Sequence, residues 1–189
     1  MKWKLLIIGL FFVTNFTVAQ ETKKLNPFQP EIDAFAKADK IMMPDEGQIL
    51  LAGSSSFTYW KNVNDYFPGN TILNRAFGGS TLLDLIHFST ETIIKYKPRQ
   101  IFIYCGENDI ASSDTVKPSD VFNRFKTLLA IIRTKLPANT PIVYLSLKPS
   151  IARWSMHERM AASNELIKNF ISTQKYIQFL DVYHAMLGD

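Results

Sequence analysis

Short apolar segments alternate with longer amphipathic segments along this chain, and that alternation limits the possible fold more than any other feature. The apolar segments are predicted to be strands and cover residues 48–52, 71–73, 100–105, 142–147 and 177–180. The segments between them have the spacing of helices and cover residues 57–63, 82–96, 119–135 and 155–174. Strands that are apolar along their whole length and separated by helices are typical of a parallel sheet covered on both faces. The pattern therefore predicts an α/β fold.

The helix predicted over residues 119–135 has the clearest pattern. Ser119 is its predicted N-cap. One face of this helix carries the apolar residues Val121, Phe125, Leu128, Leu129 and Ile132. Near the start of the domain, the stretch EIDAFAKADKIM predicts a further amphipathic helix, which the stretch MPDEG ends.

The first residues have the parts of an export signal. Lys2 and Lys4 make a basic start, residues 5–13 are apolar, and Thr17 and Ala19 are small residues at the positions that a signal peptidase recognises. The apolar stretch is shorter than the roughly 20 residues that a membrane span needs. We therefore predict a cleaved signal peptide and no stable membrane anchor, with a retained N-terminal anchor as the alternative.

Cleavage would separate a signal peptide, residues 1–19, from a folded domain, residues 20–189, in a secreted or periplasmic protein. Cys105 is the only cysteine, so no intramolecular disulfide can form, and its place at the end of an apolar segment predicts a small buried side chain. The net charge of +4 comes from scattered residues. Because no stripe of Lys and Arg could follow a phosphate backbone, the charge pattern argues against a nucleic-acid partner.

Glycines and polar residues follow the predicted strands. In chain order the stretches are GSSS, NRAFGGST, GEND, KPSIARW and DVYH. Open α/β sheets bind ligands at the carboxyl ends of their strands. Glycine there allows a close backbone approach with free N–H groups for an oxyanion. A functional site is therefore predicted at this edge of the sheet. The residues expected near its mouth are Phe57, Tyr59, Trp60, Arg153 and Trp154, although aromatic residues at strand ends are as often part of the core.

From about Asn26 to its last residue, the chain resembles the SGNH (GDSL-type) hydrolases. The stretch LLAGSSSFTYW is similar to the first block of that family and implies Ser55 as the nucleophile, with Ser54 where many members have aspartate. The stretch NRAFGGST is similar to the second block and implies a backbone oxyanion donor at Gly79. The stretch GEND is similar to the third block and implies a side-chain donor at Asn108. The stretch LKPSIARW resembles secreted or periplasmic acylhydrolases of the family.

The resemblance implies a fold and a reaction. The fold is a three-layer, doubly wound, flavodoxin-like sheet of five parallel strands in the order 2-1-3-4-5. A serine hydroxyl becomes a strong nucleophile only when a base takes its proton, and its attack on an ester creates an oxyanion that N–H groups stabilise. The resemblance thus implies a serine ester hydrolase for short-chain acyl or acetyl esters of carbohydrate or lipid type. Its substrate would be a small-molecule ester such as an acetylated carbohydrate, and no metal or organic cofactor is needed.

Each stretch taken alone has a plainer interpretation. A serine-rich turn is usually a loop or a helix cap, FGGST is usually a tight turn, and Asn108–Asp109 usually caps the following segment. The order of the stretches on consecutive strand ends is what favours catalysis. Asp109 is expected to hold its loop through hydrogen bonds.

The catalytic base is harder to assign, because the chain has only three histidines. His87 is expected to be a partly covered helix residue, and His157 an exposed one. Asp181 and His184 have the Asp-x-x-His spacing of the family's base pair, but the resemblance puts Asp181 at the end of the last strand. We therefore expect the working pair beyond residue 189, in a chain that is cut short and leaves one face of its sheet partly bare.

Two other hypotheses stay open. The serine turn could bind a carbohydrate or a small anion without turnover, although no glycine-rich phosphate motif follows the first strand. Alternatively, the chain is a truncated or degenerate, non-catalytic form of the same fold. The sequence carries no prediction of oligomeric state.

Overall fold

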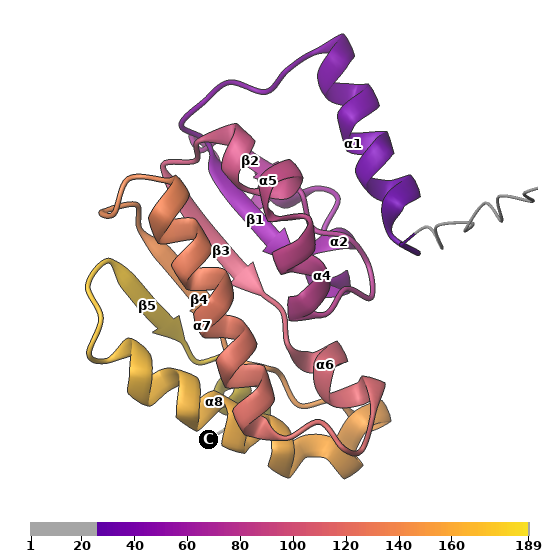
Figure 1. The fold of residues 1–189 in the computed structure, drawn as a ribbon, viewed down its shortest axis with the longest axis vertical. Helices are drawn as coiled ribbons and strands as arrows, with labels where there is room; N and C mark the ends of the chain where they lie inside the picture. The colour runs from indigo at the N-terminus through magenta and orange to yellow at the C-terminus, as the bar shows by residue number, and fades with distance from the viewer. Residues whose placement is uncertain (1–25, 189) are drawn as a thin grey trace, which may run out of the picture.

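The computed structural model of the protein describes residues 26–188, so the predicted signal peptide lies outside the described residues. One five-stranded sheet forms the centre of the molecule, and all neighbouring strands run parallel (Figure 1). The strands are β1 (Ile49–Gly53), β2 (Ile72–Asn74), β3 (Gln100–Tyr104), β4 (Ile142–Leu145) and β5 (Ile177–Leu180). Their order is β2-β1-β3-β4-β5. The predicted α/β fold with strand order 2-1-3-4-5 is confirmed.

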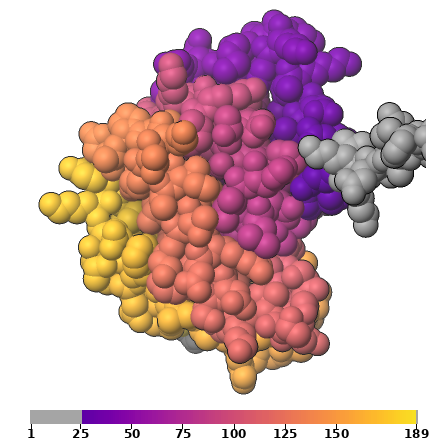
Figure 2. Space-filling model, viewed as in Figure 1, coloured from indigo at the N-terminus to yellow at the C-terminus, as the bar shows by residue number. Residues whose placement is uncertain are grey.

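The two faces of the sheet are covered by different connections. The connection from β1 to β2 runs toward one edge of the sheet, whereas the later connections run toward the other, so right-handed crossovers place them on opposite faces. One face is covered by α4 (Leu82–His87), α5 (Ser89–Thr92), α7 (Pro118–Lys135) and α8 (His157–Ile171). Figure 2 shows this side of the molecule as a continuous surface. No helix between residues 26 and 188 is both long and apolar enough to cross a membrane.

The main hydrophobic core lies between the sheet and these helices. Alternate strand residues, such as Ile101 and Ile103 on β3, are fully buried there. The predicted apolar face of α7 is confirmed, because all five of its residues are buried, namely Val121, Phe125, Leu128, Leu129 and Ile132. A large apolar side chain contributes about 1.5–3 kcal/mol when it is fully buried. This face therefore holds the larger share of the hydrophobic stabilisation.

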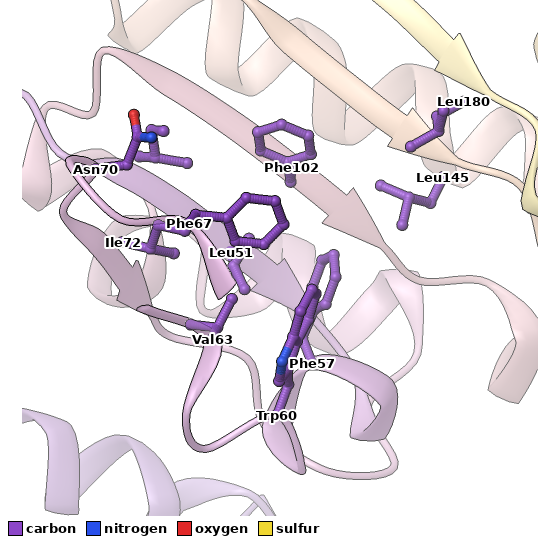
Figure 3. A pocket seen from close by; sticks show the side chains of 11 residues that line it. Leu51, Phe57, Trp60, Val63, Phe67, Asn70, Ile72, Phe102, Leu145 and Leu180 are labelled. Atoms are coloured by element: carbon purple, nitrogen blue, oxygen red, sulfur yellow. The ribbon is translucent and has the colours of Figure 1, made fainter. Parts of the chain in front are cut away.

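The opposite face of the sheet is covered only in part. Within residues 26–188, two one-turn helices, α2 (Ser55–Thr58) and α3 (Val63–Tyr66), pack against β1 and β2 there. Beyond them, Phe102, Leu145 and Leu180 line an open apolar hollow of about 340 Å³ (Figure 3). The expected partly bare face is thus present, and the third layer of the fold is incomplete in the described part of the chain.

The N-terminal helix α1 (Gln29–Ile41) is attached by a buried charge cluster. Asp39 accepts hydrogen bonds from Arg75 at 2.6 Å and from the Tyr96 hydroxyl at 2.7 Å, and the Lys95 ammonium lies 2.5 Å from its carboxylate. These partners belong to the β2–α4 loop and to the short helix η1 (Ile94–Tyr96). The cluster therefore ties α1 to segments far away in sequence.

Several helix boundaries differ from the prediction. The single helix predicted over residues 82–96 is three pieces, α4, α5 and η1. Ser119 is not an N-cap: α7 begins at Pro118, and the N–H of Lys117 donates to Asp120 at 2.8 Å. The helix predicted over residues 155–174 is preceded by η2 (Ile151–Met156), and the one predicted over 57–63 is replaced by α2 and α3.

Candidate active site

Ser55 lies at the turn where β1 ends and α2 begins. Gly53 ends the strand with a φ of +136°, and a Cβ atom there would lie 2.0 Å from the carbonyl oxygen of Tyr104 on β3. The Ser54 N–H donates to the same carbonyl at 3.0 Å, so the turn begins tightly against the neighbouring strand. Ser55 is half-buried, and its hydroxyl makes no hydrogen bond within residues 26–188. No buried side-chain polar atom in that range lacks a partner, so this hydroxyl is open to solvent.

Gly79 lies in the loop between β2 and α4, which is hydrogen-bonded to the end of β1, two residues before Ser55. The carbonyl oxygen of Gly53 accepts the Phe77 N–H at 3.0 Å and the Ser80 hydroxyl at 3.1 Å. Gly79 has a φ of +84°, in the left-handed region that favours glycine. One hydrogen bond before Gly79 and one after it thus fix its loop beside the end of β1.

Asn108 lies near the start of α6 (Glu107–Ser112), directly after β3. Its side-chain Nδ2 donates to the carbonyl oxygen of Ser80 at 2.9 Å. Ser80 therefore bonds to both neighbours: its hydroxyl contacts Gly53, two residues before Ser55, and its carbonyl contacts Asn108. The structure brings the three predicted loops together at one edge of the sheet.

Backbone donors without partners lie on these loops. Within the described part of the chain, neither the N–H of Ser55 nor that of Gly79 donates to a protein acceptor. The Asn108 amide has two N–H groups, and Ser80 takes one of them. An anion bound between the loops could therefore accept hydrogen bonds without displacing any existing one. Such donors are what an acyl-transfer reaction needs for its oxyanion.

A charged network lies beside Asn108, and the sequence pattern did not identify it. Glu107 is buried and accepts hydrogen bonds from the Tyr104 hydroxyl, from Lys148 at 3.0 Å and from Arg153 at 2.9 Å. The sequence placed Arg153 only near the mouth of the site and assigned nothing to Glu107 or Lys148. Their position in the sequence could have identified them, because Glu107 comes shortly after β3 and Lys148 shortly after β4, at the edge where the site was predicted.

Two other groups at this edge are structural. Asp109 is fully buried, accepts the Leu82 N–H at 2.8 Å and pairs with Arg124 at 2.7 Å, which confirms the expected role in holding the loop. Burial raises the pKa of its carboxyl, although these partners oppose the effect. Cys105 is buried as predicted, and burial, with the nearby Asp109 charge, raises the pKa of its thiol well above the usual value. Cys105 is therefore not a reactive thiolate.

The described histidines do not contact Ser55. His87 is exposed on α4, so the prediction of partial cover was wrong. His157 bonds through Nδ1 to the Trp154 carbonyl at 2.7 Å, and its ring stacks on that of Trp154. Neither histidine is hydrogen-bonded to Ser55.

Asp181 and His184 form an aligned pair at the start of α9 (Val182–Leu187). His184 Nδ1 lies 2.8 Å from Asp181 Oδ2. Burial alone would raise the Asp181 pKa, but the hydrogen bonds from His184 outweigh it and lower this pKa. The pair follows β5, which is three strand spacings from β1, or about 14 Å at the usual distance between strands. Neither Asp181 nor His184 makes a hydrogen bond to Ser55 in the described part of the chain.

No group of three or more His, Cys, Asp or Glu side chains suited to a metal ion occurs among residues 26–188. The adjacent loops carry the Ser55 hydroxyl and the backbone N–H groups of Ser55 and Gly79, none of which has a partner among the described residues.

Comparison with known proteins gives the class of the fold. No family model and no curated protein matches the chain. A "putative acylhydrolase" from Bacteroides fragilis is 20% identical with a TM-score of 0.69, over 85% of this chain and 78% of the other. A GDSL-like lipase from Bacteroides thetaiotaomicron is 18% identical with a TM-score of 0.66, over 82% and 79%. A variant of an acetyl-xylooligosaccharide esterase from Geobacillus stearothermophilus is 17% identical with a TM-score of 0.57, over 75% and 78%.

The protein therefore has the fold of the SGNH/GDSL-type hydrolases. At these identities the likeness establishes the fold alone, so the roles of individual residues depend on the geometry described above.

Proposed function

We propose that this chain is a secreted or periplasmic serine ester hydrolase. Ser55 is the nucleophile, and the N–H groups of Ser55 and Gly79 with the Asn108 side-chain amide bind the oxyanion. The observation that carries the proposal is the double contact of Ser80. It joins Gly53, at the end of β1, to Asn108 and holds the loop of Gly79 between them.

The reaction has two steps. A base takes the Ser55 proton while Oγ attacks the ester carbonyl. The tetrahedral oxyanion then collapses, the protonated base gives its proton to the leaving oxygen, and the alcohol departs to leave an acyl-serine. Water, activated by the same base, attacks this acyl group and releases the acid. None of the three described histidines contacts Ser55, so we assign the role of base to none of them. Fixed donors act in both steps, because each step passes through a tetrahedral oxyanion.

The substrate that we propose is a short-chain acyl or acetyl ester of a carbohydrate or a lipid. The neighbour that acts on acetyl-xylooligosaccharides supports an acetylated carbohydrate. The GDSL-like lipase neighbour supports an acyl ester of lipid type.

A second candidate is a non-catalytic module that binds a carbohydrate or a small anion. One observation favours it: no described histidine contacts Ser55, whereas the free N–H groups of Ser55 and Gly79 suit an anion without any base.

The test is a Ser55→Ala variant, with Ser56→Ala as the matched control one residue further along the same turn. Hydrolysis of p-nitrophenyl acetate should fall by at least about 10³-fold in Ser55→Ala, because the variant lacks the hydroxyl that forms the acyl intermediate. Ser56→Ala should keep a rate close to that of the parent. Equal rates in the parent and in Ser55→Ala would rule out the hydrolase. Acetate or phosphate binding that is saturable in both, with no turnover by the parent, would favour the binding module.

A further inference from the structure

The orientation of the Asn108 amide is determined by its two partners. Nδ2 donates to the Ser80 carbonyl at 2.9 Å, and Oδ1 accepts from Nη2 of Arg153 at 3.0 Å. A carbonyl can only accept and a guanidinium can only donate. The amide nitrogen must therefore face Ser80, and the amide oxygen must face Arg153. A flipped amide would set oxygen against oxygen and N–H against N–H.

Arg153 is itself held in place by a buried carboxylate. Its Nη1 donates to Glu107 Oε1 at 2.9 Å while its Nη2 reaches Asn108, so the planar guanidinium spans two neighbouring residues of α6. The Glu107 side chain is 8% exposed and is further fixed by Lys148 and by the Tyr104 hydroxyl. A rigid fork that makes two such bonds cannot be replaced by a single ammonium.

We propose that Arg153 is a positioning residue that aims the Asn108 amide at the oxyanion. It holds the amide oxygen away from the reacting atoms, so that the second N–H of Nδ2 stays directed to the space between the Gly79 and Ser55 loops. Its contribution to catalysis rests on the proposed function, because it acts through a donor that the proposed hydrolase needs.

The same contacts attach the loop after β4 to α6. Lys148 and Arg153 flank this loop, and both bond to Glu107 on the adjacent α6. The loop is thereby attached beside the candidate site at two points, and only one of them touches Asn108. Loss of Arg153 should therefore free the amide while Lys148 still holds the loop.

The first experiment reads the amide directly by NMR of the full chain labelled with ¹⁵N-asparagine. The Asn108 side-chain signals are identified by their loss in Asn108→Ala. In the parent the two Nδ2 protons should be well separated, because one is bonded to Ser80. In Arg153→Met and in Arg153→Lys they should move toward the values of a free asparagine amide. Arg153→Lys keeps the positive charge beside Glu107 and carries the test if Arg153→Met does not fold.

Arg159→Met is the matched control for this experiment. Arg159 is an arginine of similar exposure, 25% against 32% for Arg153, and it bonds to the carbonyls of Ser113 and Val116 rather than to Asn108. The Asn108 signals should be unchanged in it. Unchanged signals in both Arg153 variants would overturn the proposal.

The second experiment is a double-mutant cycle on p-nitrophenyl acetate hydrolysis. Removal of one oxyanion donor lowers kcat on the order of 10²–10³-fold, so Asn108→Ala should fall in that range. Arg153→Met should lower kcat by up to that factor with little change in KM, and the double variant should be no slower than Asn108→Ala alone. Independent, multiplying losses, or a change in KM alone, would overturn the positioning role.

Ser55→Ala separates the two proposals. If Ser55→Ala is as active as the parent, the hydrolase is wrong, and the catalytic part of the Arg153 proposal fails with it. If Ser55→Ala is inactive but the Asn108 side-chain signals are the same in the Arg153 variants as in the parent, only the positioning role fails.

Discussion

Gly53 allows β1 to approach β3 closely because glycine has no Cβ atom. It pairs with Tyr104 in the sheet, and its φ of +136° is one that side chains rarely adopt. In Gly53→Ala the added methyl would meet the Tyr104 carbonyl at 2.0 Å, so both strain and overlap act. We predict a loss of about 3 kcal/mol or more in the free energy of unfolding, measured by urea denaturation.

Gly79→Ala is the comparison for that measurement. Gly79 also has a positive φ, +84°, but an added Cβ would find no atom closer than 3.9 Å. Only the backbone strain remains, so the expected loss is about 1 kcal/mol. Equal losses in the two variants would contradict the role of the close approach at Gly53.

The sequence could place Ser55, Gly79 and Asn108 at one edge of the sheet because each belongs to a short stretch next to a strand end. The contacts of Arg153 could not be predicted in the same way. Its partners Glu107 and Asn108 lie 46 and 45 residues earlier in the chain, and only the folded loop brings them together. A sequence pattern shows local spacing, whereas a side-chain bond across two loops depends on how both connections end.

At the scale of elements, strand order and helix faces could be predicted, but helix ends could not. The apolar spacing over residues 82–96 continues through breaks that the backbone makes at Phe88 and Ile93. Thr81 and Asp84 cap α4 through reciprocal hydrogen bonds, and α4 ends after less than two turns. Packing of separate turns against the sheet preserves the apolar spacing, so the spacing alone cannot distinguish one helix from three pieces.

The attachment of α1 should depend on pH through Asp39. Burial alone would raise its pKa, but the hydrogen bonds from Lys95, Tyr96 and Arg75 outweigh it and lower the pKa below 3.8. A carboxyl with a lowered folded-state pKa stabilises the fold above its unfolded value, and this stabilisation is lost as pH falls through the folded pKa. We therefore predict that amide exchange of α1 stays slow near neutral pH and becomes fast only below about pH 3.8, relative to α7.

Asp39→Asn checks the cause of that dependence. It leaves Arg75 and Lys95 without a buried anion, and a broken buried pair costs about 3–5 kcal/mol. Exchange in α1 should already be fast at neutral pH in this variant. The same slow exchange in the parent and in Asp39→Asn would show that the charge cluster does not hold α1.

At the scale of the whole molecule, the sheet is packed unequally on its two faces. The face under α7 and α8 is closed, whereas the face with α2 and α3 leaves Phe102, Leu145 and Leu180 around an open hollow within the described residues (Figure 3). The continuously apolar strands predicted two apolar faces, whereas the partly bare face was expected only from the resemblance to the SGNH hydrolases, because the cover of each face comes from other segments.

The open face should bind a hydrophobic dye such as anilinonaphthalene sulfonate in the folded state. Leu180 is 46% exposed at the edge of the hollow, so Leu180→Lys should lower dye fluorescence without a large loss of stability. Leu83→Lys is the matched control, because Leu83 is 52% exposed on α4, which packs on the opposite face of the sheet. If both variants lower the fluorescence equally, the dye reports scattered apolar side chains, and the unequal cover of the sheet has no measurable consequence at this surface.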